Sequence, residues 1–291
     1  DPDRPTVPGL VCVNYEGFVE DLSIGNRILI DDGELAFTVT GKANNEIIAT
    51  AENDGWIKSR KSINLPGVSL KLPSLSEKDK EYIEFATRHD VAFIAHSFVR
   101  RKEDVLAIKQ ILGLNKSKVK IIAKIENQEG VDNIDEILDH AYGVMVARGD
   151  LGIEIPGERI PVIQRRLIAA CLQRKRPVII ATQMLHSMIE NPRPTRAEIS
   201  DIANAIYNHT DAIMLSGESA YGKYPVEAVQ MMTKVAFEVE AEKERREFSI
   251  SSIENEIAAF LANSAYQASL ELPVKAVIVD SQTGRTARYL S

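Results

Sequence analysis

Short apolar runs, separated by longer amphipathic segments, constrain the fold of this sequence most. The runs begin at residues 91, 119, 143, 178 and 212, roughly 25–35 residues apart, which is about the length of one strand–helix unit. Nearly continuous apolar strands are typical of a parallel sheet buried on both faces. We therefore predict an α/β fold for residues 70–247, with strands at Val91–Ala95, Val119–Ala123, Gly143–Ala147, Val178–Ala181 and Ala212–Leu215.

Three helix starts support this interpretation. Ser76 and Thr195 each stand three residues before an acidic residue, Asp79 and Glu198, as in a capping box. Pro225 stands at the first position of a further amphipathic segment, where proline is well tolerated. A closed barrel of eight such units needs ~250 residues, and this sequence shows five units. The pattern indicates either an open α/β sheet or a barrel with three units outside this chain.

Residues 1–69 follow a different pattern. Two β-prone runs, Arg27–Ile30 and Ala36–Thr40, flank the turn signal Asp31-Asp32-Gly33, and a third run follows at Ile47–Ala51. This predicts a small antiparallel sheet.

Residues 248–291 begin with a helical run at Ile257–Leu261, which leads to the apolar segment Lys275–Val279. We predict that this segment is a further buried parallel strand. It is followed by a Ser/Thr/Gly loop and a helix start, as in the first unit of another α/β domain. The sequence is thus expected to form three domains, over residues 1–69, 70–247 and 248–291.

Composition excludes several classes of protein. Lys and Arg number 35 and Asp and Glu 42, so the formal net charge is −7, which argues against nucleic acid or an anionic membrane as the main partner. The two cysteines, Cys12 and Cys171, form no CxxC pair, which favours a reducing compartment and no structural zinc. No apolar run approaches the ~20 residues of a membrane helix, and the first residues carry no signal-peptide pattern. We expect a cytoplasmic protein.

Candidate functional residues follow the predicted strands, because chemistry in parallel α/β folds lies at the carboxyl ends of the strands. The second strand continues into Lys124 and Glu126, which alternation places on the same side. A plain ion pair is the alternative to a charged site here. The third strand ends in Arg148-Gly149-Asp150, where exposed amides near a helix start would suit an anion. The alternative for this segment is an ordinary turn with a solvated aspartate.

Glu126 and Asp150 come from neighbouring strands and could together bind Mg²⁺ or Mn²⁺, which prefer oxygen ligands. Thr182, after the fourth strand, could donate or relay a proton, or could be a helix cap or a core-edge hydroxyl. The turn Ser216-Gly217-Glu218 could bind an anion through its amides or be an ordinary turn. Together these residues fit a small anionic carbonyl or enolate held by a divalent metal, with Lys124 stabilising charge on an oxygen or a transferring phosphoryl group.

Long segments of this sequence resemble the signature segments of the pyruvate kinase family. They are Ile121 to Val131 (IIAKIENQEGV), Val144 to Pro156 (VMVARGDLGIEIP), Ala181 to Met188 (ATQMLHSM), Pro192 to Glu198 (PRPTRAE) and Ile213 to Glu218 (IMLSGE). The resemblance runs through most of the chain. It implies a (β/α)8 TIM barrel that is interrupted after its third strand by a small inserted β-barrel domain, which closes on the nucleotide, and is followed by a C-terminal α/β domain. This chain would then hold barrel units four to eight, part of the inserted domain with its exit at Asn64–Gly67, and the start of the C-terminal domain.

The resemblance also implies an activity and a set of residue roles. The family transfers a phosphoryl group from phosphoenolpyruvate to ADP, giving pyruvate and ATP. Lys124 resembles the lysine that stabilises charge on the phosphoryl group, and Glu126 and Asp150 match the protein ligands of Mg²⁺ (or Mn²⁺). Thr182 matches the threonine associated with protonation of the enolate carbon. The turn whose amides hold the substrate carboxylate corresponds to Ala147, Arg148, Gly149 and Asp150.

Weaker correspondences concern the nucleotide and an effector. Asp32 and Lys61 stand where the inserted domain faces the nucleotide. The loop that binds sugar-phosphate effectors in the family corresponds to Ser281, Thr283, Gly284 and Thr286. The resemblance implies a homotetramer for the full-length protein, and K⁺ ligands and a phosphoryl-binding arginine that would lie outside this chain.

Two rival interpretations stay open at this stage. A metal-dependent aldolase or lyase acting on pyruvate or an enolate also needs a barrel and two carboxylates, although it lacks the inserted β domain. A chain without the first three barrel units could also be an inactive fragment or a binding module.

Overall fold

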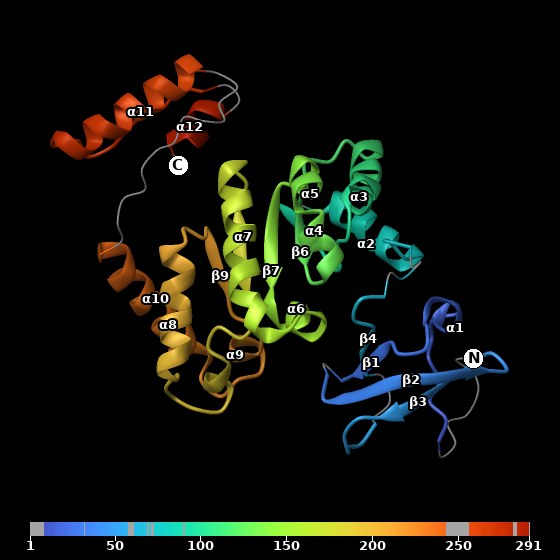
Figure 1. Ribbon diagram of the computed structural model, residues 1–291. Coiled ribbons are helices and arrows are strands. Elements are labelled where there is room, and N and C mark those ends of the chain that lie inside the picture. Colours follow the sequence, from blue (N-terminus) through green and yellow to red (C-terminus); the bar gives the residue numbers. More distant parts are fainter. Residues whose placement is uncertain are drawn as a thin grey trace.

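The structure is a computed structural model that describes residues 9–31, 33–57, 61–68, 70, 73–89, 91–242, 256–281 and 284–290. Figure 1 shows a small β-rich part that contains the N-terminus, a central part of strands and helices, and a helical part at the C-terminus.

The N-terminal part is a small antiparallel sheet, as the sequence predicts. Its strands lie in the order β3-β2-β1-β4. Asp31 and Gly33 have φ angles of 57° and 90° in the turn between β1 and β2, which is the left-handed backbone that such tight hairpin turns require. Leu22 and Val39 belong to the separate apolar core of this part. The elements are α1 (Phe18–Asp21), β1 (Arg27–Ile30), β2 (Leu35–Ala43), β3 (Glu46–Ala51) and β4 (Ile63–Asn64).

The central part contains a parallel sheet of five strands in the order β5-β6-β7-β8-β9. Each strand lies beside its neighbour in the sequence, which confirms the predicted α/β fold with a parallel sheet. The strands are β5 (Phe93–His96), β6 (Lys120–Ile125), β7 (Gly143–Ala147), β8 (Val178–Ala181) and β9 (Ala212–Met214). β7 is buried along its whole length, as expected for a sheet with helices on its faces.

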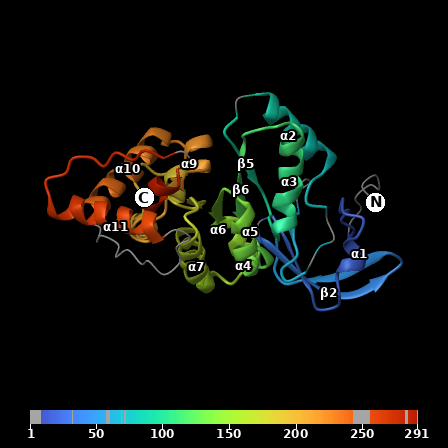
Figure 2. The same ribbon diagram turned by 90° about the horizontal axis from the view of Figure 1, so that it is seen from above.

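Helices connect the strands, and the view from above in Figure 2 shows several of them around the sheet. Both predicted capping boxes are confirmed, with Ser76 before α2 and Thr195 before α8, and α10 begins at Pro225. The helices around the sheet bury apolar side chains such as Ile108, Leu167 and Ile202 in one core with it. Burial of each such side chain contributes ~1.5–3 kcal/mol to folding. The helices are α2 (Glu77–Arg88), α3 (Lys102–Leu114), α4 (Gln128–Asp132), α5 (Ile134–His140), α6 (Arg148–Glu154), η1 (Gly157–Arg159), α7 (Ile160–Gln173), η2 (His186–Ile189), α8 (Arg196–Tyr207), α9 (Gly217–Ala220) and α10 (Pro225–Glu242).

The C-terminal part differs from its prediction. The helical run at Ile257–Leu261 is confirmed inside α11 (Glu256–Glu271), and α11 packs against α12 (Arg285–Leu290). Lys275–Val279, however, does not form a buried parallel strand: it has no regular structure, and Ile278 is 97% exposed. A parallel strand needs a neighbour to satisfy its backbone groups, and no strand of the described residues lies beside this segment.

Among the residues that the structure describes, no helix combines the length and the apolar character that crossing a membrane requires.

Candidate active site

The polar candidates come together at the carboxyl ends of three neighbouring strands. Lys124 lies on β6 and Glu126 directly follows it, while Gly149 and Asp150 lie in the first turn of α6, which follows β7 without a loop. Thr182 follows β8. Because the strands are parallel and adjacent, these residues share one edge of the sheet, where sites of α/β proteins form.

Lys124 and Glu126 form a partly buried ion pair. The Lys124 Nζ atom lies 2.7 Å from Glu126 Oε1, so the two side chains lie on the same side, as strand alternation predicts. The second oxygen, Oε2, accepts a hydrogen bond of 2.6 Å from the backbone N–H of Phe98. Lys124 also donates to the Ser97 hydroxyl at 3.0 Å. The loop after β5 thus holds both charged groups in place.

Burial dominates the electrostatics of Glu126, whose side chain is 1% exposed. Loss of solvation raises the pKa of its carboxyl above the usual value, and the charge of Asp150 raises it further. The contact with Lys124 and the Phe98 N–H act in the opposite direction. Glu126 and Asp150 therefore lie close enough for their charges to interact.

The residues at this edge fit a divalent metal ion. Glu126 Oε1 is buried, and its neighbour is the Lys124 ammonium, so this oxygen already faces a positive charge, and the charge of Asp150 acts on the same carboxylate. Within the described residues there is no cluster of three or more His, Cys, Asp or Glu side chains suited to a metal. Two carboxylates are nevertheless enough for Mg²⁺, which keeps several waters as ligands.

Thr182 and Gly149 are joined directly across the ends of β7 and β8. The backbone N–H of Gly149 donates a hydrogen bond of 2.7 Å to Thr182 Oγ1, and this hydroxyl donates to the Ala181 carbonyl at 2.6 Å. The Gly149 amide, expected to be exposed, is thus bonded within the protein. Thr182 caps the first turn of α6 from a neighbouring strand, so the sequence-based alternative of a capping hydroxyl also describes its role here.

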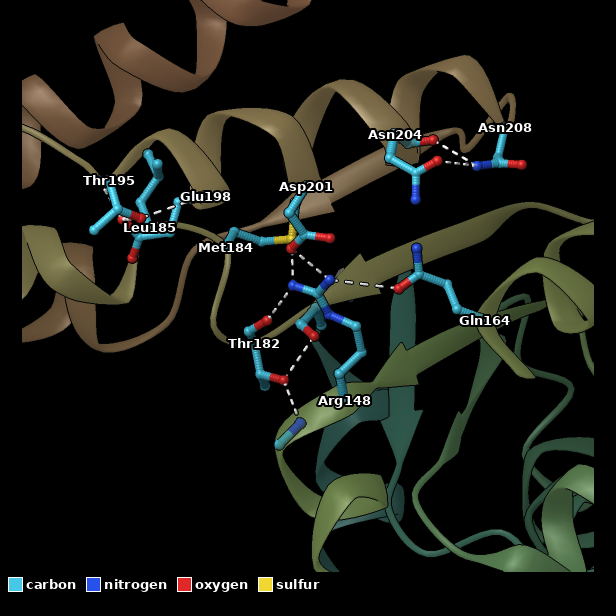
Figure 3. A network of polar contacts seen from close by, with 12 residues as sticks. Arg148, Gln164, Thr182, Met184, Leu185, Thr195, Glu198, Asp201, Asn204 and Asn208 are labelled. Carbon is cyan, nitrogen blue, oxygen red and sulfur yellow. Dashed lines mark hydrogen bonds and ion pairs between the residues drawn. The ribbon is translucent and has the colours of Figure 1, made fainter. Parts of the chain in front are cut away.

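The Arg148 side chain lies in a polar network beside Thr182 (Figure 3). Its guanidinium contacts Asp201 Oδ2 on α8 at 2.6 Å and donates to the Thr182 carbonyl at 2.8 Å. It also donates to Met184 Sδ at 2.9 Å and to Gln164 Oε1 at 3.4 Å. This guanidinium therefore fixes the loop after β8, while the role that the resemblance gives to Arg148 concerns its backbone amide.

The turn Ser216-Gly217-Glu218 has an internal partner. The Ser216 N–H donates to the carboxylate of Glu218 at 2.8 Å. Of the two sequence-based interpretations, the arrangement favours an ordinary turn over an anion-binding loop.

The predicted nucleotide residues lie on the small β part. The Lys61 ammonium pairs with Asp31 at 2.7 Å, whereas Asp32 lies outside the described residues. A Cβ atom built at Gly33 would lie 3.9 Å from Ile153 Cγ2, so the turn between β1 and β2 approaches α6. A cavity of about 970 Å³ lies between the two parts, and Leu65, Ser97 and Phe98 are among the residues that line it.

Of the predicted effector residues, Ser281 and Gly284 precede α12, and Thr286 lies in its first turn. Ser281 and Thr286 are half-buried, and Gly284 has a φ angle of 72°. Thr283 lies outside the described residues. Because Lys275–Val279 is not a strand here, this loop does not follow a strand end in the structure.

Four residues of the site are absent from the sequence-based prediction. Ser97 and Phe98 follow β5, so inspecting the end of that strand as well would have found them. Asp201 and Gln164 reach Arg148 from α8 and α7, 53 and 16 residues away along the chain. No local pattern marks such distant partners.

Fold and site together define an α/β protein with a charged and hydroxyl-bearing edge at the ends of its parallel strands. Its family follows from comparison: the family model described as pyruvate kinase, barrel domain, matches residues 5–229. The chain belongs to the pyruvate kinase family.

Several curated relatives agree with this assignment. A pyruvate kinase from Borreliella burgdorferi is 53% identical over 98% of this chain and 60% of its own length. One from Bacillus licheniformis is 48% identical over 98% of this chain and 50% of its own length. One from Clostridium acetobutylicum is 47% identical, covering 96% of this chain and 60% of its own length. The chain thus spans about half to three fifths of the length of these relatives.

Proposed function

We propose that this chain carries part of the active site of a pyruvate kinase, which transfers the phosphoryl group of phosphoenolpyruvate to ADP and gives pyruvate and ATP. The observation that carries the proposal is the partly buried pair of Lys124 and Glu126, with the charge of Asp150 acting on Glu126. All three residues lie in the part of the chain that matches the barrel-domain model of the pyruvate kinase family.

The strand order supports a barrel arc. Strands β5 to β9 follow one another in sequence order and are all parallel, whereas a doubly wound sheet reverses its strand order at a switch point. A (β/α)8 barrel adds each strand beside the last. We assign the five strands to barrel units four to eight, residues 1–69 to an inserted domain, 70–247 to the barrel and 248–291 to the start of a C-terminal α/β domain.

Lys124 would stabilise the transferring phosphoryl group. In the transfer, the bond from phosphorus to the enolate oxygen breaks, and a bond to a terminal phosphate oxygen of ADP forms. Negative charge on the nonbridging oxygens is best stabilised by a fixed ammonium group. Glu126 and Ser97 fix the Lys124 ammonium, so little reorganisation is needed at the moment of reaction.

Glu126 and Asp150 would hold the divalent ion, Mg²⁺ or Mn²⁺. When bound, such an ion offsets the negative charge on substrate oxygens. The Phe98 N–H holds Glu126 Oε2, and Oε1, which faces the Lys124 ammonium, would be the oxygen that binds the ion.

Gly149 and Thr182 would serve the organic part of the substrate. The Gly149 amide would bind the carboxylate, together with the rest of the turn Ala147 to Asp150. Thr182 would pass a proton to the methylene carbon of the enolate, which then becomes the methyl group of pyruvate. A hydroxyl is a weak acid by itself, so we assign it a relay from water rather than the role of proton source.

The small β part would act as a lid that carries nucleotide-binding groups, Lys61 and Asp32. Its support is the approach of the turn between β1 and β2 to α6, the helix that begins at the site. We further propose a cytoplasmic homotetramer whose K⁺ ligands lie outside this chain.

An effector site for a sugar phosphate is proposed at Ser281, Thr283, Gly284 and Thr286. The left-handed backbone at Gly284, directly before α12, supports a loop that turns its amides toward a ligand.

The test is a coupled assay of pyruvate formation, run on the full-length protein and on this 291-residue chain. We expect ADP-dependent pyruvate formation by the full-length protein. Formation of pyruvate from a larger carbonyl substrate without ADP would instead indicate an aldolase or lyase. If neither reaction occurs, the proposed function is wrong. Activity of the full-length protein alone would show that this chain needs residues beyond it.

A further inference from the structure

The loop from Thr182 to Leu185 has an unfavourable backbone. Thr182 and Gln183 are consecutive non-glycine residues with φ angles of 69° and 54°. Each left-handed residue of this kind costs ~1–3 kcal/mol and persists only where its surroundings impose it. The contacts at the two ends of the loop therefore determine where the Thr182 hydroxyl lies.

The first end of the loop is held from β7 and α6. Arg148 donates to the Thr182 carbonyl, and the Gly149 N–H donates to the Thr182 hydroxyl. These two contacts fix the position of Thr182. Arg148 also donates to Met184 Sδ, but among the described residues no hydrogen bond from that side reaches Leu185.

The second end of the loop is held by Glu218, which lies on α9 after β9 and is 1% exposed. Its Oε1 accepts a hydrogen bond of 3.0 Å from the Leu185 N–H, and its Oε2 accepts one of 2.8 Å from the Ser216 N–H. One buried carboxylate thus joins the loop after β8 to the turn after β9. The fully buried side chains of Met184 and Leu185 anchor the same end.

We propose that Glu218 is a positioning residue, which holds the Thr182 hydroxyl at the site through the loop from Thr182 to Leu185. Glu218 is buried, and both of its carboxylate oxygens accept hydrogen bonds from backbone amides. It is therefore not placed to bind a substrate, and its effect on Thr182 passes through the loop. The consequence for proton transfer rests on the proposed function, whereas the effect on the position of Thr182 does not.

Hydrogen exchange of the Gly149 amide in the full-length protein tests this proposal. This N–H is bonded to the Thr182 hydroxyl, so its protection reports whether Thr182 stays in place. In Glu218→Gln, the side-chain NH₂ faces one of the two backbone donors and leaves it unsatisfied. We expect exchange at Gly149 to become ~10-fold faster or more, because an unsatisfied buried donor favours opening of the loop.

Glu198→Gln is the matched control. Glu198 accepts hydrogen bonds from the backbone and hydroxyl groups of Ser187 and Thr195. It thus lies directly beyond the same loop but accepts no hydrogen bond from the described residues Thr182–Leu185. Faster exchange at Gly149 in Glu218→Gln alone would support the proposal. Equal protection at Gly149 in the wild type and Glu218→Gln, or equal acceleration in both variants, would overturn it.

Glu218→Asp covers the case in which Glu218→Gln fails to fold, because it keeps the charge on a shorter side chain. We expect intermediate exchange at Gly149, and wild-type protection would overturn the proposal. In the full-length protein, Glu218→Gln should slow proton uptake by the enolate more than it changes KM for phosphoenolpyruvate. If the wild-type protein makes no pyruvate, the proposed function fails, while the exchange result still decides the role of Glu218.

Discussion

The ammonium group of Lys124 and the carboxylate of Glu126 lie 2.7 Å apart, with 24% and 1% of their side chains exposed. The contact joins a partly exposed cation to a buried carboxylate, which it helps to keep charged. A buried charge that loses its partner destabilises the folded state, often by ~3–5 kcal/mol. The two residues must therefore be tested separately, each with a control for folding.

Glu126→Gln should abolish activity of the full-length protein at ordinary Mg²⁺. The neutral amide is a poorer ligand for a hard cation, so Mn²⁺ affinity, measured by titration, should fall ~10-fold or more. Glu154→Gln is a suitable control, because Glu154 is a half-buried carboxylate on α6, to which we assign no ligand role. Undiminished turnover and Mn²⁺ affinity in Glu126→Gln would refute the metal assignment.

Lys124→Met should lower kcat by ~10²-fold or more, as expected when one fixed electrostatic donor is removed from a transition state. Phosphoenolpyruvate binding should weaken less than kcat falls. The matched control is Lys120→Met on the same strand, where the ammonium lies 4.2 Å from the centre of the Tyr142 ring. If substrate binding is lost while kcat stays normal, Lys124 is only an anchor for the substrate.

Thr182→Val should slow incorporation of solvent deuterium into the methyl group of pyruvate, because valine has the shape of threonine but no hydroxyl. Thr182→Ser keeps the hydroxyl and should retain most of the exchange. Both variants should bind Mn²⁺ like the wild type, since Thr182 is not a proposed ligand. Deuterium incorporation at the wild-type rate in Thr182→Val would exclude the relay.

Titration of Glu198 should make the free energy of unfolding depend on pH in acidic solution. Burial raises the pKa of its carboxyl, but hydrogen bonds from Ser187 and Thr195 outweigh burial, so the net pKa is lowered. A lowered folded-state pKa contributes stability above the unfolded value of about 4.3, and this contribution is lost as pH falls through the folded-state value. Urea unfolding of Glu198→Gln should therefore show a smaller loss of stability below about pH 4 than the wild type. Parallel stability curves for the two proteins would contradict this assignment.

Much of the fold could be predicted because buried parallel strands are continuous apolar runs. β7 and β8 begin and end where the sequence indicates. Lys275–Val279 has the same pattern and is not a strand in the structure, because a run of residues does not itself provide a neighbouring strand. Tertiary pairing, rather than composition, decided this case.

The candidate site could be predicted only in part. Strand alternation placed Lys124 beside Glu126, and parallel order placed Asp150 near them. The bond between Gly149 and Thr182 could not be predicted, because it depends on a left-handed backbone that threonine rarely adopts. The sequence indicated only that Glu218 belongs to a polar turn. Its burial and its hydrogen bond from Leu185 could not be predicted, because both arise from packing.

The bond from Gly149 to Thr182 has a consequence for selectivity. Any anion that takes the Gly149 amide must replace an internal hydroxyl and not a water molecule, so weakly accepting ions gain little from binding there. A carboxylate accepts a stronger hydrogen bond than a neutral hydroxyl does and can compete. When an anion binds the Gly149 amide, Thr182 Oγ1 loses its hydrogen-bond donor. Binding of the anion and release of the Thr182 hydroxyl therefore occur together.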